Sequence, residues 1–282
     1  MTSTASKSVL ITGGAGGLGL SMARQFRERG HRVAVCARTQ SALDETARDL
    51  PGVVAIRADV ADPRDRAGLL EEVVARHGDL DVLVNNAAIT NAHDYTNTYT
   101  LSADRTRDEL EINFAAPIDL TRMFLAWRRS SALDDAPASI VMVNTPGALF
   151  PLEANLIYSA TKAGLHMFTL ALRRHLQHTP VTVVEIFPPG LNTNLTPDLV
   201  VASHADNGQE AIDAVARESV DGILDGQELI LPHPDAARLY ERFAVQFDEP
   251  LLDQINAGVQ RRPGWDGSTA GQFRASETGR TN

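Results

Sequence analysis

The feature that most constrains this fold is a glycine-rich segment that lies between an apolar run and a helical pattern, close to the N-terminus. Residues 8–11 form the short apolar run, residues 12–19 read Thr-Gly-Gly-Ala-Gly-Gly-Leu-Gly, and residues 20–26 follow a helical period. A strand, a glycine turn and a helix in this order let the backbone approach a pyrophosphate at the helix N-terminus. A flexible turn without a ligand is the alternative, but the order of the three segments favours dinucleotide binding.

Apolar runs and helical segments alternate along the rest of the chain. We expect further strands at residues 32–36, 53–56, 79–84, 139–143, 181–187 and 228–231, and helices that include residues 63–77, 101–130, 210–224 and a last one from 234. This alternation predicts an α/β fold, a single Rossmann-type doubly wound parallel sheet of about seven strands in the order 3-2-1-4-5-6-7, with helices on both faces. We assign residues 1–262 to this one NAD(P)-binding domain, including its C-terminal helices, and expect a flexible tail over residues 263–282.

The end of the second strand bears on the choice of cofactor. NAD-binding versions of this fold place an acidic residue there to take the ribose hydroxyl. Here the strand ends Cys-Ala-Arg-Thr, so no acid is present and Arg38 is placed to meet a 2′-phosphate with its fork of donors. The alternative is that Arg38 is an ordinary surface residue. The missing carboxylate favours NADP over NAD.

Tyr158 and Lys162 are four residues apart in a segment that has a helical apolar period, so their side chains should lie one above the other. An ammonium group beside a phenol favours the phenolate. Lowering a tyrosine pKa from about 10 by roughly three units requires ~4 kcal/mol, and the product is an acid/base that works near neutral pH. The alternative is a solvated helix face.

Polar residues follow several of the expected strands at their carboxyl ends, where ligands bind in doubly wound sheets. They are Arg38, Asp59, Asn86, Thr145 and Thr193. These positions therefore predict one shared site. Asp79 and Asp81, in contrast, flank the start of a strand, and we interpret this pair as structural.

Asn113 lies in the middle of the helix that we expect over residues 101–130. An asparagine gains little on a helix face, so a buried Asn113 needs hydrogen-bond partners. Pro117 should kink this helix or reset its hydrogen bonds nearby.

Two polar segments have no expected helix or strand. Residues 91–100, with His93, Tyr95 and Tyr99, either border the substrate or form a solvated loop. Residues 194–209 are rich in turn formers, and we expect them to be mobile. Their apolar residues suggest an apolar substrate lining; these are Leu195, Leu199, Val200 and Val201.

Composition excludes several classes of protein. The net charge is -10 without a basic run, so we expect no nucleic-acid partner. No apolar run approaches the ~20 residues of a membrane span, and Cys36 is the only cysteine, so we expect a cytoplasmic protein without a membrane partner. His175 and His178 have no third ligand nearby, so we expect no metal site. The serine-hydrolase pattern Gly-x-Ser-x-Gly is absent.

Together, these motifs resemble the short-chain dehydrogenase/reductase family over roughly residues 7–232. The resemblance rests on the glycine pattern of residues 12–19, Asp59-Val60, Asn85-Asn86-Ala87-Ala88, Asn113, Thr145, Tyr158-x-x-x-Lys162 and the turn from Pro188 to Thr193. It implies a nicotinamide cofactor, hydride transfer between a small-molecule carbonyl and an alcohol, and a homodimer or homotetramer. Residues 165–173 and the double proline further resemble a bacterial subgroup near the lipoteichoic-acid operon reductases, whose substrates are poorly defined.

The resemblance also implies a role for each matching residue. Tyr158 is the general acid/base, Lys162 tunes it and contacts a ribose, Thr145 orients the substrate oxygen, and Asn113 anchors a proton-relay water. The implied cofactor contacts are Thr12, Gly13, Ala15, Gly17, Leu18, Gly19, Arg38, Asp59, Val60, Asn86, Ala87, Ala88, Tyr158, Lys162, Pro188, Gly190 and Thr193.

Three positions depart from the family pattern. Thr145 stands where the family usually has serine, which keeps the hydroxyl but adds a methyl group and restricts χ1. Ala88 replaces a glycine near the cofactor. If Thr193 is aligned with the threonine of the family pattern, Pro189 takes the place of the turn glycine. If Pro189-Gly190 is aligned with the Pro-Gly turn instead, Asn194 takes the threonine position. We prefer the first alignment because it keeps a hydroxyl.

The sequence therefore predicts an NADPH-dependent carbonyl reductase or alcohol dehydrogenase. Two other functions remain open on the same cofactor site. One is dehydratase or isomerase chemistry, and the other is a regulatory protein that holds NADP without turnover.

Overall fold

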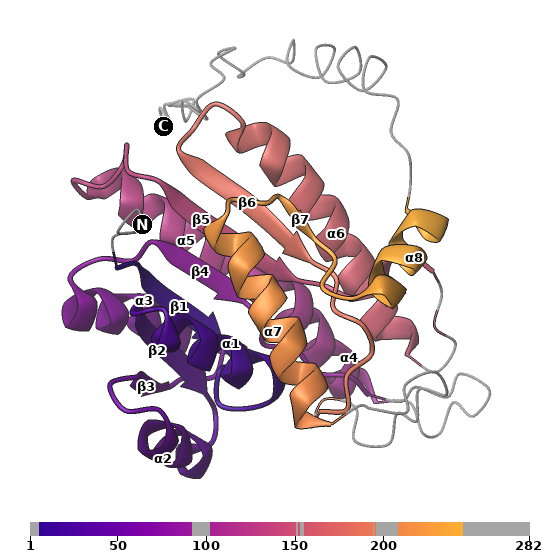
Figure 1. Ribbon diagram of the computed structural model, residues 1–282, viewed down its shortest axis with the longest axis horizontal. Helices are drawn as coiled ribbons and strands as arrows, with labels where there is room; N and C mark the ends of the chain where they lie inside the picture. The colour runs from indigo at the N-terminus through magenta and orange to yellow at the C-terminus, as the bar shows by residue number, and fades with distance from the viewer. Residues whose placement is uncertain are drawn as a thin grey trace, which may run out of the picture.

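The computed structural model describes residues 6–91, 102–150, 152, 155–193, 195 and 208–244. Its strands are β1 (Ser8–Thr12), β2 (Arg32–Ala37), β3 (Val54–Arg57), β4 (Val82–Asn85), β5 (Ala138–Val143), β6 (Val181–Ile186) and β7 (Leu229–Ile230). They form one seven-stranded sheet in the order β3-β2-β1-β4-β5-β6-β7, and all six neighbouring pairs are parallel (Figure 1). The predicted fold class and strand order are confirmed.

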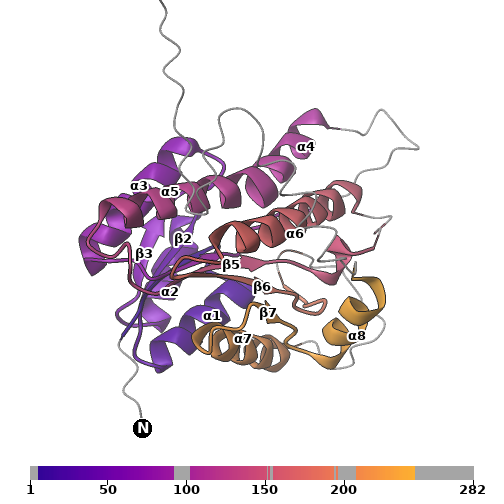
Figure 2. The same ribbon diagram turned by 90° about the horizontal axis from the view of Figure 1, so that it is seen from above.

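Helices cover both faces of the sheet. They are α1 (Gly17–Glu28), α2 (Gln40–Asp49), α3 (Pro63–His77), α4 (Ala103–Leu110), α5 (Ala116–Ser130), α6 (Leu156–Leu176), α7 (Gln209–Leu224) and α8 (Pro234–Phe243), with a π-helical turn η2 (Glu111–Ala115) and a 3-10 turn η3 (Pro146–Ala148). Figure 2 shows α3, α5 and α6 on one face and α1 and α7 on the other. Successive side chains of a strand point to opposite faces of the sheet. In β1, Val9 and Ile11 pack in the apolar core beneath α1 and α7, whereas Leu10 packs in the core on the other face.

The bounds of α3 match the prediction because both ends carry strong local signals. Asp62 caps the helix by accepting a 2.8 Å hydrogen bond from the Arg64 backbone N–H, and Pro63 occupies the first helical position. Gly78 ends the helix with a φ of 83°, a left-handed conformation that glycine adopts without strain. Sequence patterns therefore locate this element to the residue.

The helix expected over residues 101–130 is instead three elements, α4, η2 and α5. Pro117 is the second residue of α5 and has no N–H to donate, so the hydrogen-bond ladder changes over the preceding turn. The predicted reset near Pro117 is thus confirmed as a π-helical turn that contains Asn113. Such turns are frequent at functional sites.

The fourth strand begins at Val82 rather than at residue 79. Asp79 pairs with Arg32 at 2.8 and 2.9 Å, and Asp81 accepts a 2.8 Å hydrogen bond from the Ser8 backbone N–H. Both carboxylates lie at the strand starts, away from the carboxyl ends of the sheet. Their interpretation as structural residues is confirmed.

Several predictions fall on residues outside the described ranges. These are the loop residues 92–100, Asn194, the stretch 196–207 and the tail 263–282, so each remains an expectation. Within the described ranges, no helix is long and apolar enough to cross a membrane. The same ranges contain no group of three or more His, Cys, Asp or Glu side chains that suits a metal ion.

Candidate active site

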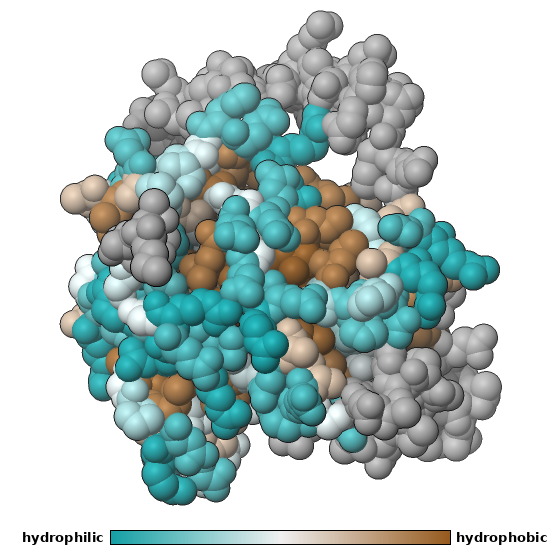
Figure 3. All heavy atoms as spheres, in the orientation of Figure 1, coloured by the Kyte–Doolittle hydropathy of each residue, from teal (hydrophilic) through white to brown (hydrophobic). Residues whose placement is uncertain are grey.

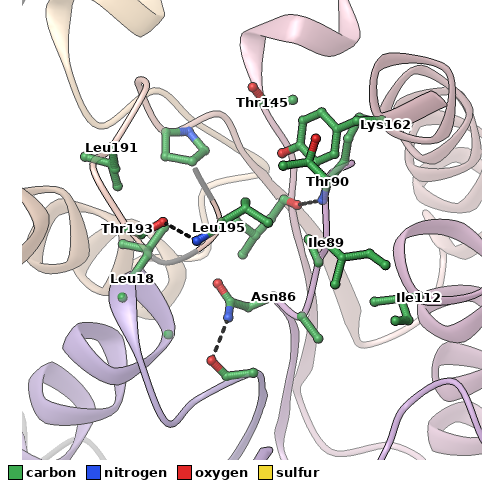
Figure 4. Close-up of a pocket in the computed structure, with 18 of the residues that line it drawn as sticks. Leu18, Asn86, Ile89, Thr90, Ile112, Thr145, Lys162, Leu191, Thr193 and Leu195 are labelled. Carbon is green, nitrogen blue, oxygen red and sulfur yellow. Dashed lines mark hydrogen bonds between the residues drawn. The ribbon is translucent and has the colours of Figure 1, made fainter. Parts of the chain in front are cut away.

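A cavity of about 910 Å³ lies outside the carboxyl ends of the strands. The predicted residues that line it are Gly13, Gly17, Leu18, Gly19, Arg38, Asp59, Val60, Asn86, Ala87, Ala88, Thr145, Tyr158, Lys162, Pro188, Gly190 and Thr193. Figure 4 shows Leu18, Thr193 and Leu191 on one side of this cavity and Thr145, Lys162 and Thr90 on the opposite side. The predicted residues Thr12, Ala15 and Asn113 do not line it.

The glycine turn has a backbone that only small residues permit. Gly13 and Gly17 have φ values of 65° and 50°, in the left-handed region. A Cβ at Gly19 would lie 2.5 Å from both the Asn86 amide nitrogen and the Gly13 carbonyl oxygen. The N-terminus of α1 has no side-chain cap and no acidic residue in its first turn, so its N–H groups suit an anion. The turn therefore fits the pyrophosphate of a dinucleotide.

Thr12 and Asn86 hold this turn to the end of β4. The Thr12 hydroxyl accepts 3.0 Å hydrogen bonds from the backbone N–H groups of Asn86 and Ala87. The Asn86 side chain donates to the carbonyls of Thr12 and Gly13 at 2.9 and 3.2 Å. Thr12 thus supports the cavity from behind, whereas Ala15 packs against the core on the α1 face.

Arg38 is exposed and lines the cavity at the carboxyl end of β2, which lies three strands away from β5 in the sheet. Arg57, at the end of the neighbouring strand, donates from Nε to the Arg38 carbonyl oxygen at 3.2 Å. Among the described residues, neither guanidinium group has a carboxylate partner. Arg57 was not predicted from the sequence, although the parallel register pairs it with Ala37, the residue before Arg38.

Tyr158 and Lys162 lie on α6, and the Lys162 Nζ is 5.8 Å from the centre of the Tyr158 ring. Nζ donates a 2.8 Å hydrogen bond to the Val143 carbonyl oxygen at the end of β5. Burial lowers the pKa of Lys162 to about 8, and the charge of Glu185 opposes this shift. The arrangement keeps the lysine nitrogen fixed at the cavity wall.

The expected lowering of the Tyr158 pKa is wrong for the protein alone. Burial raises the pKa of Tyr158 above its usual range, and the negative charge of Glu109 adds to the shift. Loss of hydration penalises the phenolate more than the neighbouring ammonium group favours it. Tyr158 is therefore a protonated group at neutral pH, suited to donate a proton.

Thr145 begins the turn η3 directly after β5. Its hydroxyl accepts a 3.2 Å hydrogen bond from the Gly147 backbone N–H, and its own backbone N–H donates to the Asn144 side-chain oxygen at 3.0 Å. The side chain is half-buried at the cavity wall (Figure 4). The hydroxyl that the usual serine supplies is thus retained in this position.

Asn113 is fully buried in η2, and its predicted need for partners is confirmed. Its side chain accepts from the Ile89 backbone N–H at 2.9 Å and donates to the Ile89 carbonyl at 2.8 Å. Glu109, one turn earlier, is also fully buried and accepts a 2.6 Å hydrogen bond from the Asn91 N–H. The sequence analysis missed Glu109 because a glutamate in a polar helix looks like a surface residue.

The end of the cavity near Thr145 is mostly apolar. Its apolar lining includes Phe150, Leu152 and Leu239, while Leu195 also lines the cavity and Leu191 lies on the side opposite Thr145 (Figure 4). Helix α8 borders this region, because its Leu239 lines the cavity and the Phe150 and Phe243 rings lie 5.0 Å apart. Apolar side chains are also visible on the surface between α7 and α8 (Figure 3). Among the described lining residues at this end, the polar side chains Asn155 and Thr90 contact each other, because the Asn155 amide donates a 2.6 Å hydrogen bond to the Thr90 hydroxyl. An uncharged, apolar molecule fits this surface.

Comparisons with known proteins agree with the geometry. A family model described as short chain dehydrogenase matches residues 7–202. The uncharacterized oxidoreductase DltE of Bacillus subtilis is 34% identical over 254 residues, which cover 84% of this chain and 96% of that protein. The 11-beta-hydroxysteroid dehydrogenase A of Sesamum indicum is 29% identical over 247 residues, covering 86% and 66% of the two chains. The actinorhodin polyketide ketoreductase with NADPH superposes with a TM-score of 0.66 and 26% identity, covering 84% and 94%.

Proposed function

The chain belongs to the short chain dehydrogenase family, and from this premise we propose that it reduces an apolar ketone or aldehyde to an alcohol with NADPH, or runs the reverse reaction. As a member of the family it is an NAD(P)-dependent oxidoreductase that acts on CH–OH or C=O groups. The observation that carries the proposal is that Thr145, Tyr158 and Lys162 share one wall of the cavity that Arg38 also lines.

A nicotinamide bound in this cavity would supply the hydride that the carbonyl carbon of the substrate accepts. Tyr158 donates its hydroxyl proton to the carbonyl oxygen, a step that its raised pKa favours because the group is protonated at neutral pH. The Thr145 hydroxyl and the Lys162 ammonium group stabilise the negative charge that develops on this oxygen. In the reverse direction Tyr158 accepts the proton.

The preference for NADPH is supported by the two arginines at the ends of β2 and β3. Arg38 lines the cavity, and Arg57 adds a second positive charge that contacts its backbone. No carboxylate follows Ala37 to take a ribose hydroxyl, as NAD-specific sites of this fold require. A guanidinium group without a carboxylate partner is suited to a phosphate.

A homo-oligomer is the assembly that we propose. The support comes from two of the four large apolar side chains that are exposed among the described residues, Leu110 on α4 at 46% and Met167 on α6 at 52%. The two helices that carry them, α4 and α6, are in contact with each other, and exposed apolar side chains are typical of surfaces that bind another protein chain. A cytoplasmic location is supported by Cys36, a buried free thiol that suits a reducing compartment.

The proposal is tested by following NADPH oxidation with a panel of uncharged apolar ketones and aldehydes, in wild type and in Tyr158→Phe. We expect turnover in wild type, a loss of about a hundredfold or more in the variant, and NADPH affinities that agree within about twofold. The substitution removes only a hydroxyl, which has no hydrogen bond to any described residue. Equal turnover by both proteins would overturn the assignment of Tyr158 as the proton donor. NADPH binding without any turnover would favour a regulatory protein.

A further inference from the structure

A chain of buried polar groups lies behind the wall that carries Thr145 and Lys162. Glu185 on β6 is 1% exposed, His166 on α6 is 5% exposed, and Asn144 at the end of β5 is 3% exposed. None of the three is explained by the reaction as described above. Each is expensive to bury unless its hydrogen bonds are satisfied.

The three side chains satisfy one another around the Glu185 carboxylate. His166 Nδ1 lies 2.9 and 3.0 Å from the two carboxylate oxygens, and the Asn144 amide donates to one of them at 2.7 Å. Because a carboxylate only accepts hydrogen bonds, Nδ1 must carry a proton. The carboxylate therefore fixes both the tautomer of the histidine and the orientation of the asparagine.

Asn144 links this cluster to two residues of the cavity wall. Its side-chain oxygen accepts a 3.0 Å hydrogen bond from the Thr145 backbone N–H, and its amide also donates to the Lys162 carbonyl oxygen at 3.2 Å. One side chain thus contacts the backbone of both residues to which the proposed function assigns stabilisation of the substrate oxygen. Loss of the carboxylate would remove one of the three hydrogen bonds that orient Asn144, and loss of the imidazole would remove the group that holds the carboxylate in place.

Glu185 occupies a sheet position that stability alone would fill with an apolar residue. Val183, two residues earlier on the same face, packs in the apolar core with Met142, the cross-strand partner of Glu185. A buried polar cluster of this kind contributes little net stability compared with well-packed apolar side chains. Its place beside the active-site wall points to a positional role.

Other titratable groups also face this cluster. Lys162 approaches from α6, and the charge of Glu185 raises its pKa. Tyr240 approaches from α8, and its pKa is raised by burial and by Glu185, while Arg173 opposes that shift. The ring of Phe187 separates His166 from Tyr240, at 5.5 and 5.0 Å from the two rings. Glu185 is therefore the negative charge that acts on the Lys162 ammonium group.

We propose that Glu185 and His166 are positioning residues for the reaction. Through Asn144 they hold the backbone of Thr145 and Lys162, and the carboxylate supports the charged form of the lysine. The inference rests on the proposed function, because its consequence for turnover requires that Thr145 and Lys162 act on the substrate oxygen.

The test compares Glu185→Gln, His166→Leu, the conservative His166→Gln and the control Thr169→Val. Thr169 is fully buried on the same helix, and its hydroxyl donates only to the Leu165 carbonyl, so the control removes a buried hydrogen bond without touching Asn144. We expect kcat to fall about ten- to a hundredfold in Glu185→Gln and His166→Leu, with the Kd of NADPH unchanged within about twofold. His166→Gln keeps a donor toward Glu185 and should recover most of the lost rate.

Two further readouts separate a positional role from a merely structural one. Glu185→Gln removes the charge that raises the Lys162 pKa, so the alkaline decline of kcat should move about one pH unit lower. The backbone N–H of Thr145 should exchange with deuterium faster in His166→Leu than in Thr169→Val. If Glu185→Gln and His166→Leu match Thr169→Val in kcat, pH profile and Thr145 exchange, the cluster is structural only. If wild type binds NADPH without turnover, the proposed function fails, whereas Thr145 exchange still tests the link through Asn144.

Discussion

The Lys162 Nζ atom lies 5.8 Å from the centre of the Tyr158 ring, one helical turn along α6. The two groups respond to burial in opposite senses, because the phenol holds its proton more tightly and the ammonium group holds its proton less tightly. Both shifts favour neutral forms in the cavity wall. The electrostatics of this pair therefore yields predictions for stability and for activity.

Lys162→Met should stabilise the fold while abolishing turnover. The pKa of Lys162 falls from 10.5 to about 8 on folding, so at neutral pH the folded state pays for a buried charge. This cost is fully present below pH 8 and disappears as the pH rises toward the unfolded pKa of 10.5. The variant also loses the hydrogen bond to Val143, which offsets part of this effect. We therefore expect the free energy of unfolding to rise by ~1–3 kcal/mol at pH 7 and hardly at all near pH 10. Urea denaturation of wild type and Lys162→Met at both pH values measures this difference. A variant less stable than wild type at pH 7 would show that the buried charge of Lys162 does not destabilise the fold.

Glu109→Gln should lower the pKa of Tyr158, because the carboxylate raises that pKa by its charge. Tyrosinate should then form about half to one pH unit earlier on alkaline titration, measured by ultraviolet absorbance with Tyr158→Phe as the reference. Asp108→Asn on the exposed face of the same helix is the matched control and should leave the titration unchanged. Identical titrations of the Glu109 variant and wild type would remove Glu109 from the active-site electrostatics.

Thr145→Val should lower kcat about a hundredfold, because it keeps the branched shape and removes the hydroxyl that faces the reacting oxygen. It also leaves the Gly147 N–H without its partner at the start of η3, at a cost of about 1 kcal/mol. Thr145→Ser keeps the hydroxyl and should remain within about threefold of wild type. Steady-state kinetics with NADPH in excess compares the three proteins. A Val variant as active as the Ser variant would exclude a role for this hydroxyl.

Gly19→Ala should weaken the binding of NADPH and NADH alike. An added Cβ meets the Asn86 side chain and the Gly13 carbonyl at 2.5 Å, so the turn that faces the pyrophosphate must shift. We expect at least about a tenfold rise in both dissociation constants, measured by nucleotide fluorescence. Gly68→Ala is the control, because Gly68 is exposed on α3 with open space around it, and this change should stabilise the helix by ~1 kcal/mol. Unchanged affinities in Gly19→Ala would place the cofactor elsewhere.

Local patterns were sufficient to predict the sheet and most of the cavity wall. Parallel strands end at one edge, so residues that follow different strands, such as Arg38 and Thr145, could be placed together without coordinates. Helix α3 was predicted to the residue because its cap, its proline and its terminal glycine are all local signals.

Residues whose importance depends on tertiary burial could not be predicted. Glu109 and Glu185 look like surface glutamates in sequence, and only packing shows that both are buried near Tyr158 and Lys162. The predicted direction of the Tyr158 pKa shift was wrong for the same reason, because the spacing of Tyr158 and Lys162 in the sequence does not show how far burial removes water from the phenol. The contact between Arg57 and Arg38 required the strand register.

The measurement that tests the central claim most directly is a fluorescence titration of wild type and Arg38→Ala with NADPH and with NADH. We predict that wild type binds NADPH more tightly than NADH, and that Arg38→Ala weakens NADPH binding about ten- to a hundredfold while leaving NADH binding nearly unchanged. Equal affinity of wild type for both nucleotides would contradict the assignment of Arg38 to the 2′-phosphate. Binding of neither nucleotide would contradict the proposed reaction itself.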